Sequence, residues 1–106
     1  MPVSIGNGRL IYMNDENRDL YELPIDGILD LHTFNPRDVK QLIPEYIEAC
    51  LEKKIFSLRI IHGKGIGVLR ETTHAVLKKH PAVKSFRLDP DPGGSWGATL
   101  VELKIK

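Results

Sequence analysis

The sequence lacks the features that mark membrane, secreted and disulfide-linked proteins. Cys50 is the single cysteine among 106 residues, so the chain has no internal disulfide. No apolar run approaches the ~20 residues that a membrane-spanning helix needs. The N-terminus, MPVSIGNGRLIYMNDENRDL, has no apolar segment typical of a secretory signal. These absences predict a reduced, cytoplasmic protein of about one domain, with no membrane association.

The net charge of +1 conceals an uneven distribution of charge along the chain. Residues 1–52 carry four basic and ten acidic side chains. Residues 53–87 carry nine basic side chains and one acidic side chain, a net charge of +8. Such a segment favours a polyanionic partner, either DNA or RNA. The alternative is that these side chains only solvate the outer faces of a helix and a strand.

Hydrophobic periodicity divides the chain into two parts. Residues 1–25 show no sustained period, and we expect an N-terminal extension with little regular structure. The domain that follows, 26–106, has strand patterns at 27–32, 55–62, 83–88 and 97–105 and helix patterns at 36–52 and 68–80. Asn35 followed by Pro36 is a preferred N-cap before a preferred first helical residue, and it marks the start of the first helix.

The order strand, helix, strand, helix, strand, strand predicts an α/β protein built as a two-layer α+β sandwich. Strand–helix–strand connections form parallel, right-handed crossovers. Two crossovers in the same direction place both helices on one face of a mixed four-stranded sheet. Alternation along the strands then assigns polar side chains to the open face: Asp30, His32, Arg59, Arg87, Glu102 and Lys104.

Side chains with acid–base chemistry occur where the first two strands are predicted to end. Ligands of α/β proteins bind at the carboxyl ends of parallel strands. We expect Asp30 and His32 to project from one face there and to lie near His62. A histidine at a strand end also has a purely structural explanation, which is the more frequent one.

A glycine-rich turn, HGKGIG over 62–67, leads from the second strand into the second helix. Backbone N–H groups in such a turn, together with a helix N-terminus, favour a phosphate. The spacing matches neither a Walker A motif nor a dinucleotide-binding motif, and glycines in this position also serve steric needs. The candidate phosphate and nucleic-acid ligands are Gly63, Lys64, Gly65, Gly67, Arg59, Arg70, His74, Lys78 and Trp96. In this set, Arg70, His74 and Lys78 form the outer stripe of the helix, and Trp96 either stacks on a base or packs on the sheet.

Three segments together resemble the signature motifs of small MutS-related (Smr) domains. They are LDLH at 29–32, HGKG at 62–65 and GGSWGATLVEL at 93–103, in the family's order and spacing. The resemblance implies a fold similar to the C-terminal domain of translation initiation factor three. It also implies binding of DNA or RNA and nicking or cleavage of it, in some relatives at the ribosome. Asp30, His32 and His62 match family motif positions, as do Gly97 and Thr99.

Two functions of different classes follow. In the first, the protein is an endonuclease in which Asp30, His32 and His62 are catalytic. Histidine moves protons near neutral pH, and Asp30 orients a histidine or binds a divalent cation, Mg²⁺ or Mn²⁺. No other cofactor and no dedicated metal site are expected. In the second, the protein is a non-catalytic module that binds DNA, RNA or a ribosome. This is favoured by Thr33, where the family often has glycine. An adaptor that uses the acidic N-terminal extension has less support.

Overall fold

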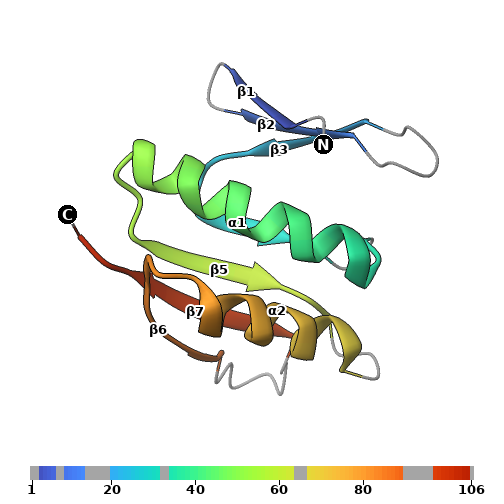
Figure 1. Ribbon diagram of the computed structural model, residues 1–106, viewed down its shortest axis with the longest axis vertical. Helices are drawn as coiled ribbons and strands as arrows, with labels where there is room; N and C mark the ends of the chain where they lie inside the picture. The colour runs from blue at the N-terminus through green and yellow to red at the C-terminus, as the bar shows by residue number, and fades with distance from the viewer. Residues whose placement is uncertain are drawn as a thin grey trace.

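The computed structural model describes the backbone of residues 3–6 and the full residues 9–13, 20–31, 34–63, 67–89 and 97–105. Two sheets and two helices account for most of these residues (Figure 1). In chain order the elements are β1 (Val3–Gly6), β2 (Arg9–Met13), β3 (Leu20–Pro24), β4 (Ile28–Asp30), α1 (Pro36–Glu52), β5 (Ser57–Ile61), α2 (Val68–Lys79), β6 (Val83–Leu88) and β7 (Ala98–Leu103). Neither of the described helices is long and apolar enough to cross a membrane.

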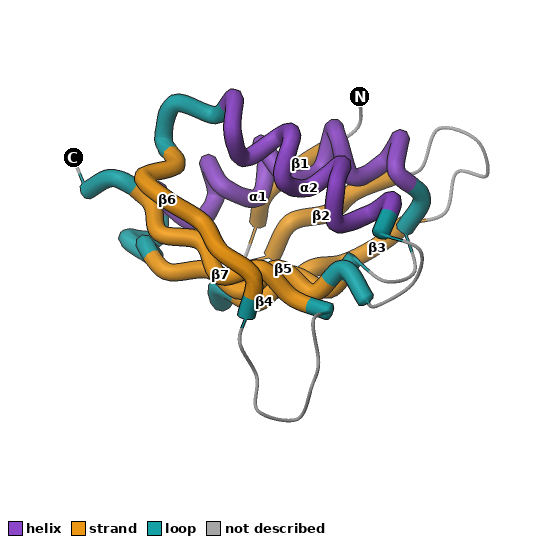
Figure 2. The backbone as a smooth tube through the Cα atoms, turned by 90° about the horizontal axis from the view of Figure 1, so that it is seen from below, coloured by secondary structure: helices purple, strands orange, loops and turns teal. Residues whose placement is uncertain are grey.

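The larger sheet has the strand order β4-β5-β7-β6. β4 pairs with β5 in parallel, whereas β7 runs antiparallel to both of its neighbours, β5 and β6. Both helices cover one face of this sheet, and the other face is open (Figure 2). The predicted two-layer sandwich with a mixed four-stranded sheet is therefore confirmed.

Helix α1 forms where its end signals and its apolar stripe predict it. The side-chain oxygen of Asn35 accepts a hydrogen bond from the backbone N–H of Asp38 at 2.9 Å, and Pro36 opens the helix. The apolar stripe supplies most of the fully buried residues of the core, among them Leu42, Ile43, Tyr46, Ile47 and Cys50. Burial of this stripe is what attaches the helix to the sheet.

The prediction that residues 1–25 have little regular structure is wrong. β1, β2 and β3 form an antiparallel sheet of their own. Leu10 and Tyr12 of β2 are fully buried and belong to the same hydrophobic cluster as α1. The Tyr12 hydroxyl donates to Asp38 Oδ1 at 2.9 Å, in the first turn of α1. Helix α1 thus lies between this small sheet and the remainder of the domain (Figure 1).

A single buried hydroxyl ties the small sheet, α1 and β4 together. Tyr46 of α1 donates to the backbone carbonyl of Pro24 and accepts from the backbone N–H of Gly27, both at 3.1 Å. Burial raises the pKa of Tyr46 above its ordinary range, so the hydroxyl keeps its proton. This contact fixes the chain where it enters β4, the first strand of the candidate site.

Candidate functional site

Asp30 and His62 lie at the same edge of the larger sheet, as predicted, but they face opposite sides of it. Asp30 pairs with Ile61 in the parallel β4–β5 ladder and is exposed on the open face. His62, the next residue, is 3% exposed and contacts residues on the helical side. The structure therefore does not show His62 as an accessible partner of Asp30. His32 and Thr33 lie outside the described residues.

His62 is held by the backbone and by the central strand. Its N–H and that of Gly63 both donate to the carbonyl of Gly97, at 2.8 and 2.9 Å. Its Nε2 lies 2.8 Å from Thr99 Oγ1, and its Nδ1 lies 3.2 Å from the carbonyl oxygen of Gly63. Burial lowers the pKa of His62; the contact with the Gly63 backbone opposes this, and the Arg70 guanidinium adds to it. Neutral imidazole is thus the favoured form.

His74 does not share the outer face of α2 with Lys78, so its predicted placement is wrong. Its Nε2 lies 2.7 Å from Thr99 Oγ1, and its ring is edge-on to the ring of His62. On the other side, its ring centroid is 5.0 Å from that of Phe86 in β6. Burial lowers the pKa of His74, and the nearby His62 and Arg70 lower it further. Lys78 is exposed, as expected.

Thr99 joins these two histidines and is the residue whose role sequence reasoning missed. It is fully buried in β7, where its register partners are Ile60 of β5 and Leu88 of β6. Its hydroxyl meets both Nε2 atoms, which gives a hydrogen-bonded chain from β5 through β7 to α2. A threonine at an inward position of a central strand needs a hydrogen-bond partner. That requirement is a sequence signal that could have indicated a polar neighbour on the helical side of the sheet.

Arg70 and Gly67 shape the entrance to α2. Gly67 caps the helix with a φ of 89°, a left-handed conformation that favours glycine. A Cβ atom on Gly67 would lie 2.9 Å from a terminal nitrogen of Arg70, so the guanidinium folds back over the start of the helix. A cation at a helix N-terminus adds to the positive potential that the backbone creates there. Gly63 is also in a positive-φ conformation, and Lys64 and Gly65 lie outside the described residues.

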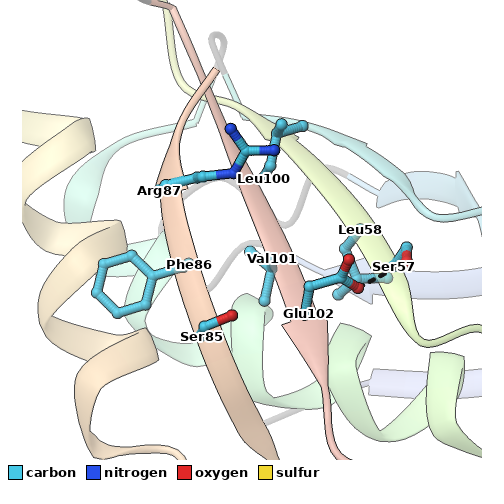
Figure 3. A pocket seen from close by; sticks show the side chains of 8 residues that line it. All are labelled: Ser57, Leu58, Ser85, Phe86, Arg87, Leu100, Val101 and Glu102. Atoms are coloured by element: carbon cyan, nitrogen blue, oxygen red, sulfur yellow. Dashed lines mark hydrogen bonds between the residues drawn. The ribbon is translucent and has the colours of Figure 1, made fainter. Parts of the chain in front are cut away.

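Arg59 is separated from the histidines by the sheet. It is exposed on the open face, and its guanidinium pairs with Asp89 at 3.3 Å. The same face has a shallow hollow of about 290 Å³, where Figure 3 shows the Arg87 side chain beside Leu100. Arg59 is therefore not a neighbour of Arg70 and His74, and Trp96 lies outside the described residues.

The described residues do not form a metal-binding cluster. No three histidine, cysteine, aspartate or glutamate side chains come together among them in the manner of a metal site. The described part of the site offers instead two imidazoles, a hydroxyl and a guanidinium. These groups can hold an anion and move a proton.

Comparison with known proteins places this arrangement in a family. The model of the Smr domain matches residues 29–104. The chain is 43% identical over 76 residues to Endonuclease MutS2 of Brevibacillus brevis, and the aligned segment covers 72% of this chain and 10% of that protein. It is 33% identical over 102 residues to Endonuclease MutS2 of Caldicellulosiruptor saccharolyticus, and the aligned segment covers 96% of this chain and 13% of that protein. That alignment includes β2 and β3, and the chain spans about a tenth of the length of these relatives.

Two solved structures have the same fold. The Smr domain of Thermus thermophilus MutS2 superposes with a TM-score of 0.68 at 31% identity, covering 73% of this chain and 96% of that one. YdaL, a stand-alone small MutS-related protein from Escherichia coli, superposes with a TM-score of 0.67 at 21% identity, covering 74% of this chain and 64% of that one. This second likeness concerns the fold alone. The resemblance of the three sequence motifs is confirmed, and the chain belongs to the Smr domain family.

Proposed function

We propose that the protein binds a nucleic-acid backbone where β5 leads into α2, and that it cleaves this backbone as an endonuclease. The observation that carries the proposal is the juxtaposition of Arg70 with two neutral imidazoles, His62 and His74. The cation supplies affinity for a phosphate, and the imidazoles supply acid–base chemistry. The relatives named Endonuclease MutS2 support the same chemistry.

The binding part of the proposal is supported by the charge of the chain. The +8 segment at residues 53–87 contains Arg70 near the start of α2 and the exposed Lys78 near its end. Contacts of this kind attract phosphates without regard to base sequence. The same segment also contains Lys64, which was predicted from the sequence to bind a phosphate.

The cleaving part of the proposal is supported by the protonation of the histidines. Because burial lowers their pKa values, both imidazoles are neutral at physiological pH, and a neutral imidazole with an open ring nitrogen can accept a proton. On RNA the attacking group is the adjacent 2′-hydroxyl, whereas on DNA it is an activated water. Asp30, at the same edge, is the candidate to orient His32 or to bind a divalent cation for the second case.

The second candidate is a non-catalytic module that binds DNA, RNA or a ribosome. The burial of His62 favours it, because a histidine that is 3% exposed does not reach a substrate directly. Thr33 in place of the usual family glycine favours it as well.

Incubation with supercoiled plasmid and with single-stranded RNA, each with and without a chelator, distinguishes these functions. Nicked circles or RNA fragments support the endonuclease, whereas salt-dependent binding without product supports the module. If neither binding nor cleavage is seen, the proposal fails.

The binding site is tested by Arg70→Ala, with Lys104→Ala as the control, because the exposed Lys104 lies outside the +8 segment and at the opposite edge of the sheet from the start of α2. We expect Arg70→Ala to weaken binding equally for different duplex sequences and to reduce the slope of log affinity against log salt by about one. Lys104→Ala should leave the slope unchanged. Equal effects of the two substitutions would contradict binding at α2.

A further inference from the structure

We infer that His74 is the residue that exchanges protons with the substrate, and that His62 is a positioning residue that acts on it through Thr99. This inference rests on the proposed function, because it names the proton-transfer group of that site. It follows from the order of the hydrogen bonds along His62, Thr99 and His74 and from which ring nitrogens they occupy.

The order of these hydrogen bonds is fixed by the carbonyl of Gly63. A carbonyl oxygen only accepts hydrogen bonds, so the contact of 3.2 Å requires a proton on His62 Nδ1. In the neutral ring Nε2 is then bare, and it accepts the Thr99 hydroxyl proton over 2.8 Å. The one proton of the Thr99 hydroxyl is used in that hydrogen bond. Its oxygen must therefore accept a hydrogen bond from His74 Nε2 over 2.7 Å. The neutral His74 ring therefore carries its proton on Nε2 and has a bare Nδ1.

Of the ring nitrogens of His62 and His74, Nδ1 of His74 remains for a substrate. Both nitrogens of His62 are engaged, and its side chain is buried beneath α2. His74 is half-buried, and among the described residues its Nδ1 has no hydrogen-bond partner. A proton added to Nδ1 leaves all three hydrogen bonds as they are, because Nε2 continues to donate to Thr99. Protonation of His62 on Nε2, by contrast, breaks the hydrogen bond that this nitrogen accepts, and the Thr99 hydroxyl has to rotate its proton away.

The surroundings of His74 suit a base that meets a phosphate. Arg70 stands one turn earlier on α2, and its guanidinium is close enough to lower the pKa of His74, so a phosphate held at the start of the helix approaches the side on which His74 lies. Among the described residues, the charged or titratable groups that face the ring are His62, which follows β5, and Arg70 from α2. β6 and β7 contribute Phe86 and Thr99, neither of which titrates in this range. Both facing groups favour the neutral form of His74.

His74 acts as a general base in the exchange of bonds at phosphorus. The attacking hydroxyl, either a 2′-hydroxyl of RNA or a water molecule, forms a bond to phosphorus while its proton moves to His74 Nδ1. The bond from phosphorus to the leaving oxygen breaks, and that oxygen takes a proton from water. His74 then returns its proton to the solvent. Phe86 on one face of the ring and Thr99 at Nε2 hold the imidazole in one orientation during the exchange.

The hydrogen-bond order is tested without any substrate. Long-range ¹H–¹⁵N spectra of the imidazoles, recorded near pH 8 on the intact chain, should show His62 protonated on Nδ1 and His74 protonated on Nε2. Thr99→Ser keeps the hydroxyl and should keep both tautomers, whereas Thr99→Val should abolish the preference at His74. A His62 protonated on Nε2, or a His74 protonated on Nδ1, overturns the inference.

The role in the reaction is tested on whichever nucleic acid the wild-type protein cleaves. His74→Ala should lower kcat by about 100-fold or more, which is the range for a lost general base, while affinity changes less than about threefold. His62→Gln should keep a pH profile with an acidic limb at a shifted midpoint, and His74→Ala should lose that limb. His80→Gln, at the far end of α2, is the control and should leave kcat unchanged.

Activity of the wild-type protein and of His74→Ala separates the role of His74 from the proposed endonuclease function. If the wild-type protein cleaves and His74→Ala cleaves as fast, the role of His74 is overturned and the endonuclease proposal stands. If the wild-type protein cleaves neither DNA nor RNA, the proposed cleavage and the role of His74 both fail. In either case the spectra decide the order of the hydrogen bonds.

Discussion

Replacement of Leu10 by alanine tests whether the N-terminal sheet is an integral part of the domain. Leu10 is fully buried in the cluster that contains the apolar stripe of α1. Truncation of a buried leucine removes its transfer free energy and leaves a cavity, and typically lowers the free energy of unfolding by about 2–5 kcal/mol. For a domain near 100 residues, a loss of about 3 kcal/mol lowers Tm by roughly 12–24 °C. The total free energy of unfolding of natural domains is only about 5–15 kcal/mol, so a loss of this size is a large fraction of it.

The matched control is Leu20→Ala in β3, the strand next to β2. Leu20 is 67% exposed, so its truncation should change the free energy of unfolding by less than about 0.5 kcal/mol. Urea and thermal unfolding, followed by circular dichroism, measure both variants on the full chain. If the two substitutions destabilise the protein equally, the small sheet is not packed on α1 and the reasoning is refuted.

Three further predictions concern the contacts described above. Tyr12→Phe removes a buried hydrogen bond to the Asp38 carboxylate, and we expect urea unfolding to show a loss of about 1.5–3 kcal/mol; a change below 0.5 kcal/mol would contradict the contact. Gly67→Ala places a side chain at φ 89° and should lower stability by about 1–2 kcal/mol without changing the helix content. Because folding lowers the pKa values of His62 and His74, the folded state binds fewer protons than the unfolded state below pH 6.5. The contribution of these two histidines to the free energy of unfolding is therefore complete above that pH. It falls as the pH decreases, by at most about 1.4 kcal/mol per pH unit for each histidine. Replacing both histidines by glutamine should flatten the pH dependence of the free energy of unfolding measured between pH 7.5 and 5.5.

The helices and the larger sheet were predictable because their signals are local. Asn35 and Pro36 mark the start of α1, and its buried stripe repeats with the helical period. The N-terminal sheet was not predictable in this way. β2 has only two fully buried residues, Leu10 and Tyr12, and their partner surface is a helix more than twenty residues later. A period of two that extends over a single pair of residues does not distinguish a strand from a loop.

The site was partly predictable for the same reason. Parallel pairing of β4 and β5 brings Asp30 and His62 to one edge, and the sequence pattern indicates this. The period of two along β5 also indicates the face, because it places His62 on the side of the buried Leu58 and Ile60, opposite Arg59. The position of His74 was not predicted because His74 lies at the border between the buried and the exposed faces of α2, where the helical period does not decide the direction of a side chain. His74 lies next to the buried Thr73 in sequence, and only the location of Thr99 on the opposing strand determines that the ring turns inward.

The site divides into a rigid part and an adaptable part. Thr99 belongs to β7, which is hydrogen-bonded on one side to β5 and on the other side to β6. Its hydroxyl therefore has little freedom, and the two histidines that contact it share that rigidity. Arg70 stands in the first turn of α2, and its guanidinium lies over the glycine at the N-cap. A fixed imidazole suits proton transfer, which depends on short distances, whereas a long flexible cation suits a phosphate backbone that approaches with varied sequence and shape. Changes at Thr99 should therefore alter the chemistry at constant affinity, and changes at Arg70 should alter the affinity first.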